Sequence, residues 1–146
     1  MRDLEDGGKE IFFANTHFDN NSPSQQLSAP LLQERTAPFA ATHPVIVIGD
    51  FNSRPPSTAY RLLTEDSTYG FVFQNTFDLA PMRIVTNQTP VPAFDVDDRI
   101  DHIFLAGDDV EWTVADWAVD LTVYGPLDRY PSDHFAIFSE VSYRAR

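Results

Sequence analysis

Short apolar runs separated by polar or proline- and glycine-rich segments dominate the chain. Residues 11–14 and 45–48 are continuous apolar runs, and the second contains only β-branched residues. This composition is typical of buried strands, and the second run suits a central strand covered on both faces. Further strands are predicted over 99–105, 110–121 and 135–141, with 110–121 forming either one long strand or two shorter ones.

Two segments have helical signals. In residues 23–40 apolar side chains recur near helical spacing, and Ser22 is a suitable N-cap. Pro30 lies inside this segment, so we expect it to kink the helix or split it into two pieces. A second, shorter helix is predicted over 57–63, with Ser57 as its cap. Because strand and helix signals alternate, the sequence predicts a mixed α/β domain.

Composition narrows the class of protein. A length of 146 residues fits one domain or part of one. Hydrophobic residues make up 42% and aromatic residues 13% of the chain, which excludes a disordered protein. No apolar run approaches the ~20 residues of a transmembrane helix. The absence of cysteine excludes a disulfide scaffold and a thiolate metal site. Residues 1–10 are predicted to be a terminal or disordered segment.

The chain is strongly acidic. It has 22 Asp and Glu residues against 10 Lys and Arg residues, for a net charge of −12. Such a chain repels a nucleic-acid backbone unless something local, such as a divalent cation, reverses the field. Its arginines are scattered rather than clustered, which disfavours binding to a long polyanion.

Polar residues gather where the predicted strands begin or end. In α/β sheets such residues tend to converge at one rim, where binding sites form. They offer carboxylates, amides and imidazoles, a donor set that suits Mg²⁺ or Mn²⁺. Taken singly, each segment is also compatible with an ordinary turn, cap or solvated histidine. The segments are Asn15-Thr16-His17, Asp50-Phe51-Asn52, Asp101 and Ser132-Asp133-His134.

Together these segments resemble the motifs of the endonuclease/exonuclease/phosphatase superfamily. The matching stretches are Asn15-Thr16-His17-Phe18-Asp19, Gly49-Asp50-Phe51-Asn52, Arg99-Ile100-Asp101-His102-Ile103-Phe104 and Ser132-Asp133-His134-Phe135. Their order matches, and the resemblance runs from about residue 11 to residue 141. It implies an α+β fold, part of a deoxyribonuclease I-like four-layer αββα sandwich.

Family members are about twice as long as this chain. The resemblance therefore implies that residues 11–146 are the C-terminal half of a domain whose N-terminal half is missing. That other half normally contributes an Asn and a Glu to the metal site. The chain could be a fragment, could pair with a complementing N-terminal half, or could be an inactive remnant that acts as a partner-binding module.

The resemblance also implies roles for individual residues in a metal-dependent phosphoester hydrolase. Asp50 would orient or deprotonate the attacking water, and Asn52 would hold a phosphate oxygen or that water. Asp133 would bind the metal, Mg²⁺ or alternatively Mn²⁺. Arg54, shortly after Asn52, is a candidate contact to the substrate phosphate, although a surface role is the simpler interpretation.

Two histidines complete the implied catalytic set. His134 would contact the phosphate and take part in proton transfer, while Asp101 would fix the orientation of its ring. His17 would be the second imidazole, bonded to the phosphate or serving the leaving group. His102, which follows Asp101, is interpreted as strand packing rather than catalysis. The sequence has no Gly-x-Ser-x-Gly elbow, which argues against a serine hydrolase.

The charge of the chain also bears on the class of substrate. Because of the acidic charge, a small phosphodiester or phosphomonoester, such as a lipid headgroup, is favoured over duplex DNA, and nucleic acid stays an alternative. The acidic loop from Asp95 to Asp98 suggests a structural calcium site as a further alternative, but it lacks the glycine and glutamate of the usual calcium loop.

Overall fold

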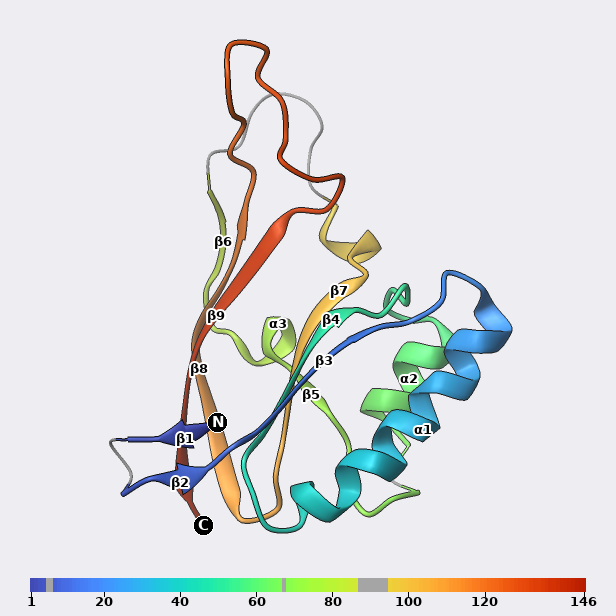
Figure 1. Ribbon diagram of the computed structural model, residues 1–146, viewed down its shortest axis with the longest axis vertical. Helices are drawn as coiled ribbons and strands as arrows, with labels where there is room; N and C mark the ends of the chain where they lie inside the picture. The colour runs from blue at the N-terminus through green and yellow to red at the C-terminus, as the bar shows by residue number, and fades with distance from the viewer. Residues whose placement is uncertain (5–6, 67, 87–94) are drawn as a thin grey trace.

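The computed structural model describes residues 1–4, 7–66, 68–86 and 95–146. Two sheets lie face to face, and helices cover the outer side of one of them (Figure 1). The elements are β1 (Arg2–Asp3), β2 (Lys9–Glu10), β3 (Phe12–His17), α1 (Ser22–Ala40), β4 (Val45–Asp50), α2 (Thr58–Thr64), β5 (Gln74–Asn75), α3 (Thr76–Leu79), β6 (Arg83–Thr86), the 3₁₀ turn η1 (Val96–Asp98), β7 (Asp101–Ala106), β8 (Val110–Asp120) and β9 (Ala136–Ala145).

The first sheet has the strand order β3-β4-β7-β5. β3 pairs parallel to β4, and β7 pairs antiparallel to β4 on its other side. The sequence predicted all three of these strands, with boundaries that differ by a few residues. Their pairing brings the C-terminal ends of β3 and β4 beside the start of β7.

The second sheet has the strand order β6-β8-β9. β8 is a single strand with an irregular register between Val114 and Asp116, so the long-strand alternative is confirmed. A terminal or disordered segment was expected over residues 1–10, and the described part of it contains a short hairpin of β1 and β2. Residues 87–94 lie outside the described residues.

α1 is one continuous helix, so the predicted split at Pro30 is wrong. Its buried face consists of Gln25, Ala29, Gln33, Thr36 and Ala40, which are small or polar residues. Among the leucines of this helix, Leu27 is 73% exposed and Leu31 is also exposed, whereas Leu32 is partly buried and packs against the core. Pro30 removes one backbone hydrogen bond of the helix, and the packing of these buried residues against the domain compensates for that loss. α2 begins as predicted, with the Ser57 hydroxyl accepting a bond from the Tyr60 amide.

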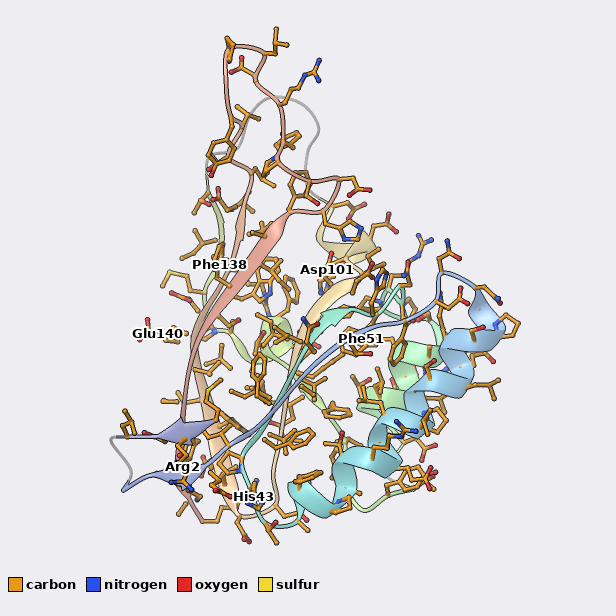
Figure 2. The ribbon with its side chains drawn as sticks, in the orientation of Figure 1. Arg2, His43, Phe51, Asp101, Phe138 and Glu140 are labelled. Atoms are coloured by element: carbon orange, nitrogen blue, oxygen red, sulfur yellow. The ribbon has the colours of Figure 1, made fainter. Side chains whose placement is uncertain are left out.

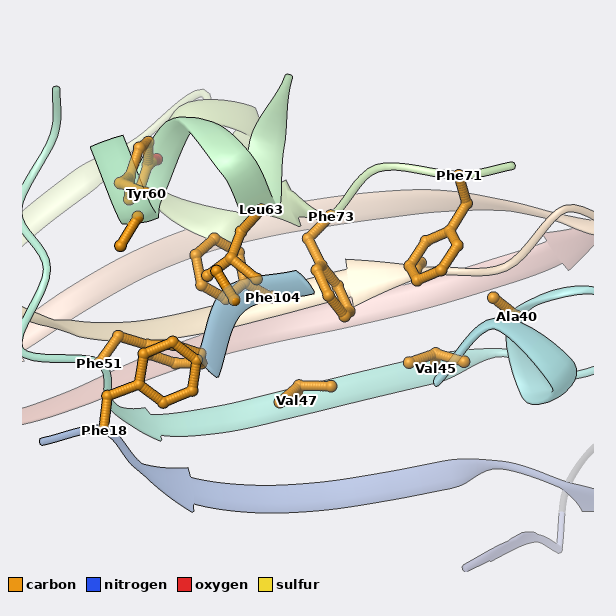
Figure 3. Packing of buried hydrophobic residues seen from close by; sticks show 13 residues of the cluster. Phe18, Ala40, Val45, Val47, Phe51, Tyr60, Leu63, Phe71, Phe73 and Phe104 are labelled. Carbon is orange, nitrogen blue, oxygen red and sulfur yellow. The ribbon is translucent and has the colours of Figure 1, made fainter. Parts of the chain in front are cut away.

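Two hydrophobic clusters define the layers. Val45, Val47 and Phe104 on one face of the first sheet pack against α1 and α2 (Figure 3). Ile46 and Leu105, on the opposite face, pack against the second sheet in the other cluster, which includes residues of β8 and β9. The order is therefore helices, sheet, sheet, which supplies three layers of the expected αββα sandwich and confirms the α+β fold class. No described helix is long and apolar enough to cross a membrane.

Candidate active site

Three of the predicted residues lie side by side at one edge of the first sheet. His17 at the end of β3 is in register with Asp50 at the end of β4, and Asp50 is in register with Asp101 at the start of β7. Figure 2 labels Asp101 at this edge and His43 at the opposite edge. Parallel pairing of β3 with β4 and antiparallel pairing with β7 thus produce the convergence that the sequence predicted.

A cavity of about 970 Å³ opens over this edge. The loop between β8 and β9 reaches it from the second sheet and contributes Asp133 and His134. Every residue predicted for catalysis or metal binding lines the cavity, and Arg54 does not. The full lining is His17, Phe18, Asp19, Asn20, Asp50, Asn52, Asp101, Asp133 and His134.

His134 and Asp101 form a hydrogen-bonded pair between the two sheets. The His134 Nδ1 lies 2.7 Å from Asp101 Oδ2. Because an ionised carboxylate can only accept, Nδ1 carries a proton and Nε2 is left facing Asp50, whose Oδ2 is 3.8 Å away. The bond to Asp101 raises the pKa of His134 above its usual value. Burial raises the pKa of Asp101, although the bond to His134 opposes that effect.

Asp50 occupies the centre of the site. Its Oδ1 accepts a 2.7 Å bond from the backbone N–H of Asn52, which fixes the carboxylate against the following turn. Its Oδ2 lies 3.2 Å from His17 Nε2, so both imidazoles approach the same oxygen. The His17 side chain is 73% exposed, whereas that of Asp50 is only 15% exposed. Asp50 is therefore an acceptor held rigidly beside two groups able to carry protons.

The Asn52 side chain is positioned by an unusual turn. Its φ is 48°, in the left-handed region that asparagine tolerates better than most residues. Its Nδ2 donates a 2.8 Å bond to the Phe18 carbonyl and thereby ties the end of β4 to the segment after β3. The turn thus orients Asn52 toward the cavity that Phe18 also lines.

The site contains a group of ligand atoms suited to a metal ion. Asp50, Asp101 and His134 each offer one atom, and these atoms lie within 4.8 Å of one another. Asp133 lines the same cavity at its exposed rim, outside that group. Carboxylate-rich donors of this kind fit Mg²⁺ or Mn²⁺. The His134 Nδ1 is bonded to Asp101, so His134 could coordinate an ion only through Nε2, and the carboxylate oxygens are the donors that Mg²⁺ and Mn²⁺ prefer.

The sequence profile of the Endonuclease/Exonuclease/phosphatase family matches residues 3–134. The chain belongs to this family. The family match spans most of the two sheets and includes every predicted catalytic residue. It therefore confirms the resemblance inferred from the motifs.

Solved structures of the family share this fold. A mannosyl-6-phosphatase from Bacteroides thetaiotaomicron is 27% identical, with a TM-score of 0.74, and the match covers 94% of this chain and 53% of that one. A family protein from Bacteroides vulgatus is 27% identical, with a TM-score of 0.72, covering 96% and 52% respectively. The human Nocturnin catalytic domain, 21% identical with a TM-score of 0.59, shares the fold. No curated protein matches the sequence significantly. The chain spans about half the length of these solved structures.

The structure differs from the predicted site in two respects: three further residues line the cavity, and Arg54 does not. Phe18, Asp19 and Asn20 line the cavity, and their signal was their position directly after His17. Arg54 forms an ion pair with Asp98 instead of lining the cavity. That pair engages one carboxylate of the acidic loop proposed as a calcium site.

Proposed function

We propose that this chain carries the acid–base residues of a divalent-metal-dependent phosphoester hydrolase. The observation that carries the proposal is the arrangement of two imidazoles around the Asp50 carboxylate, one of them oriented by Asp101. An aspartate–histidine pair fixes the tautomer of the ring and raises its basicity. Family membership supports phosphoester hydrolysis as the reaction class.

Different residues of this chain carry out the two proton transfers of the hydrolysis. Asp50 orients a water molecule and accepts its proton as the water oxygen attacks phosphorus. His134, held by Asp101, contacts the phosphate, and one of the two imidazoles donates a proton to the oxygen that leaves as the phosphorus–oxygen bond breaks. A Mg²⁺ or Mn²⁺ ion held by Asp133 and a neighbouring carboxylate would neutralise the charge of the phosphate as a Lewis acid. Asn52 stabilises the phosphate oxygen or the water.

We propose a small phosphoester as the substrate. Among the described residues that line the cavity, several are aspartates and none is Lys or Arg, so the protein itself offers little attraction to a polyanion. One structural neighbour is described as a mannosyl-6-phosphatase, which makes phosphorylated sugars natural compounds to test alongside lipid headgroups. Nucleic acid stays the alternative substrate.

We also propose that a preceding half-domain completes the metal site. The matched structures are about twice as long as this chain, and the carboxylates here are few for a tightly bound cation. The competing interpretation is an inactive or partner-binding module that has kept the site residues.

The test is hydrolysis of bis(p-nitrophenyl) phosphate by the purified chain with Mg²⁺, Mn²⁺ or EDTA. Because the metal site of this chain alone is incomplete, we expect slow metal-dependent turnover. It should fall roughly 100-fold or more in His134→Ala, because general acid–base groups contribute at least that much. His43→Ala is the matched control, since His43 lies at the opposite edge of the sheet (Figure 2). Circular dichroism establishes that each variant is folded.

If the chain alone shows no turnover, adding the missing half of the domain distinguishes two explanations. A folded, inactive chain that gains activity when the N-terminal half of a homologous domain is added would support an incomplete enzyme. A chain that stays inactive with that half and binds no Mn²⁺ would refute the hydrolase proposal in favour of the partner-binding module.

A further inference from the structure

A chain of buried polar groups lies behind the cavity, on the helix side of the first sheet. Its central member is His102, which is 1% exposed. His102 follows Asp101 on β7, so its side chain points to the opposite face from the catalytic carboxylate. Its Nε2 lies 2.8 Å from the backbone carbonyl oxygen of Ser53, the residue after Asn52. His102 therefore connects β7 to the turn that carries Asn52.

The hydrogen bonds around Asn75 determine the tautomer of this histidine. The Asn75 Oδ1 accepts a 3.0 Å bond from the Phe77 amide, which fixes the side chain with its Nδ2 toward His102. That Nδ2 is 3.0 Å from His102 Nδ1 and can only donate. Nδ1 is thus the acceptor, and Nε2 carries the proton that is donated to Ser53. Burial lowers the pKa of His102 to about 4, in agreement with a neutral ring.

The same network extends to α2 and α3. Asn75 Nδ2 also donates to the Tyr60 hydroxyl at 3.1 Å, and that hydroxyl donates to Asp78 Oδ2 at 3.0 Å. Burial raises the pKa of Tyr60 to about 12, so its hydroxyl keeps the proton it donates. The histidine is held by rigid elements rather than by a loop.

The Ser53 carbonyl is a buried group whose position affects the site. Ser53 is 1% exposed, and in the described structure its hydroxyl oxygen is buried with no hydrogen-bond partner. The residue is therefore anchored through its carbonyl, directly after the strained φ of Asn52. Leaving that carbonyl without a donor would favour a different turn conformation, because a buried unpaired carbonyl carries a desolvation penalty.

We propose that His102 is a positioning residue that, with Asn75, holds the Asp50–Asn52 turn in its active geometry through the Ser53 carbonyl. The role in turnover rests on the proposed hydrolase function, whereas the structural effect on the turn does not. In this arrangement His102, the residue next to Asp101 on β7, orients the Asp50–Asn52 turn from the face of the sheet opposite the cavity.

Three variants test the proposal. His102→Phe keeps an aromatic ring of similar size but cannot donate to Ser53. His102→Gln places an amide donor near the position of Nε2. Phe104→Leu is the matched control, because Phe104 is fully buried on the same face of β7, with ring centroids 5.2 Å from His102. It perturbs the same packing without removing a hydrogen bond to the turn.

The first readout is hydrogen exchange of the Asn52 backbone amide, which is bonded to Asp50. We expect the protection factor of this amide to fall at least about tenfold in His102→Phe and to stay near the wild-type value in His102→Gln. In Phe104→Leu it should be unchanged once corrected for global stability. With bis(p-nitrophenyl) phosphate and Mn²⁺, we expect kcat to fall ~10-fold in His102→Phe, with KM little changed. Nitrogen NMR of the wild-type chain should show a protonated Nε2 and an unprotonated Nδ1 on His102.

The opposite tautomer would overturn the proposal even if no variant folds. Unchanged Asn52 protection in His102→Phe, or an equal loss in Phe104→Leu, would also overturn it. If the wild-type chain shows no turnover even with the added N-terminal half, the hydrolase proposal fails, and the exchange and tautomer results still decide whether His102 positions the turn.

Discussion

At the scale of single residues, the bond between Asp101 and His134 determines how the site handles protons. Asp101 Oδ2 is 2.7 Å from His134 Nδ1, and this bond is the largest cause of the raised pKa of His134. A raised pKa means that the folded protein favours the protonated ring. The stabilisation of the folded protein by this bond is therefore complete below pH ~6.5 and is lost as the pH rises through the pKa of His134 in the folded state.

Asp101→Asn should lower the pKa of His134. The amide can still accept a bond from Nδ1, but it carries no negative charge to stabilise the imidazolium. NMR titration of the ring protons measures this directly, and the distant His43 provides the control in the same spectra. An unchanged His134 titration in Asp101→Asn would show that Asp101 does not govern the protonation of this ring.

At the scale of elements, the site depends on how closely β3 approaches β4. Gly49 lies opposite Thr16 in the parallel register, one position before the His17–Asp50 pair. Its φ is 145°, and a Cβ built there would overlap the Thr16 carbonyl oxygen. Only glycine lets the two strands stay paired at this point, so the spacing of His17 and Asp50 depends on it.

Gly49→Ala should therefore destabilise the chain by at least about 2 kcal/mol, because the overlap is with backbone that cannot rotate away. Gly70→Ala is the matched control: its φ of 87° is also positive, but a Cβ there meets nothing within 4 Å. Urea unfolding of both variants separates backbone strain from steric overlap. Equal losses of stability would mean that the close approach of the strands is not the cause.

The elements that the sequence predicted well are those with local signals. β3, β4 and β7 combine apolar runs with polar ends, and Ser57 caps α2 as expected. The packed face of α1 could not be predicted, because Gln33 is buried by donating to the Asp66 carbonyl, a contact 33 residues away. The Asn75–His102–Ser53 network was missed for the same reason, since its members are distant in sequence and meet only in the folded chain.

At the scale of the whole molecule, the site lies where two sheets meet and where the protein's own field is negative. Asp50 and Asp101 come from the first sheet, and Asp133 and His134 come from the loop that precedes β9 in the second. A net charge of −12 adds long-range repulsion of anions to the local aspartates. Anionic substrates would approach this face only with a cation or as small, weakly charged esters.

We therefore expect weak binding to duplex DNA. At physiological salt and with Mg²⁺, fluorescence anisotropy of a labelled duplex should give a Kd weaker than the ~10⁻⁴ M limit of ordinary non-specific binding, because few basic side chains are available to replace counterions. Glu140→Lys is a useful control, since Glu140 lies on β9 away from Asp101 (Figure 2) and its change should leave ester hydrolysis unaltered. If duplex DNA is instead cut far faster than bis(p-nitrophenyl) phosphate or sugar phosphates in direct competition, the preference for a small phosphoester is wrong. The charge of this chain would then have to be compensated elsewhere in the complete enzyme.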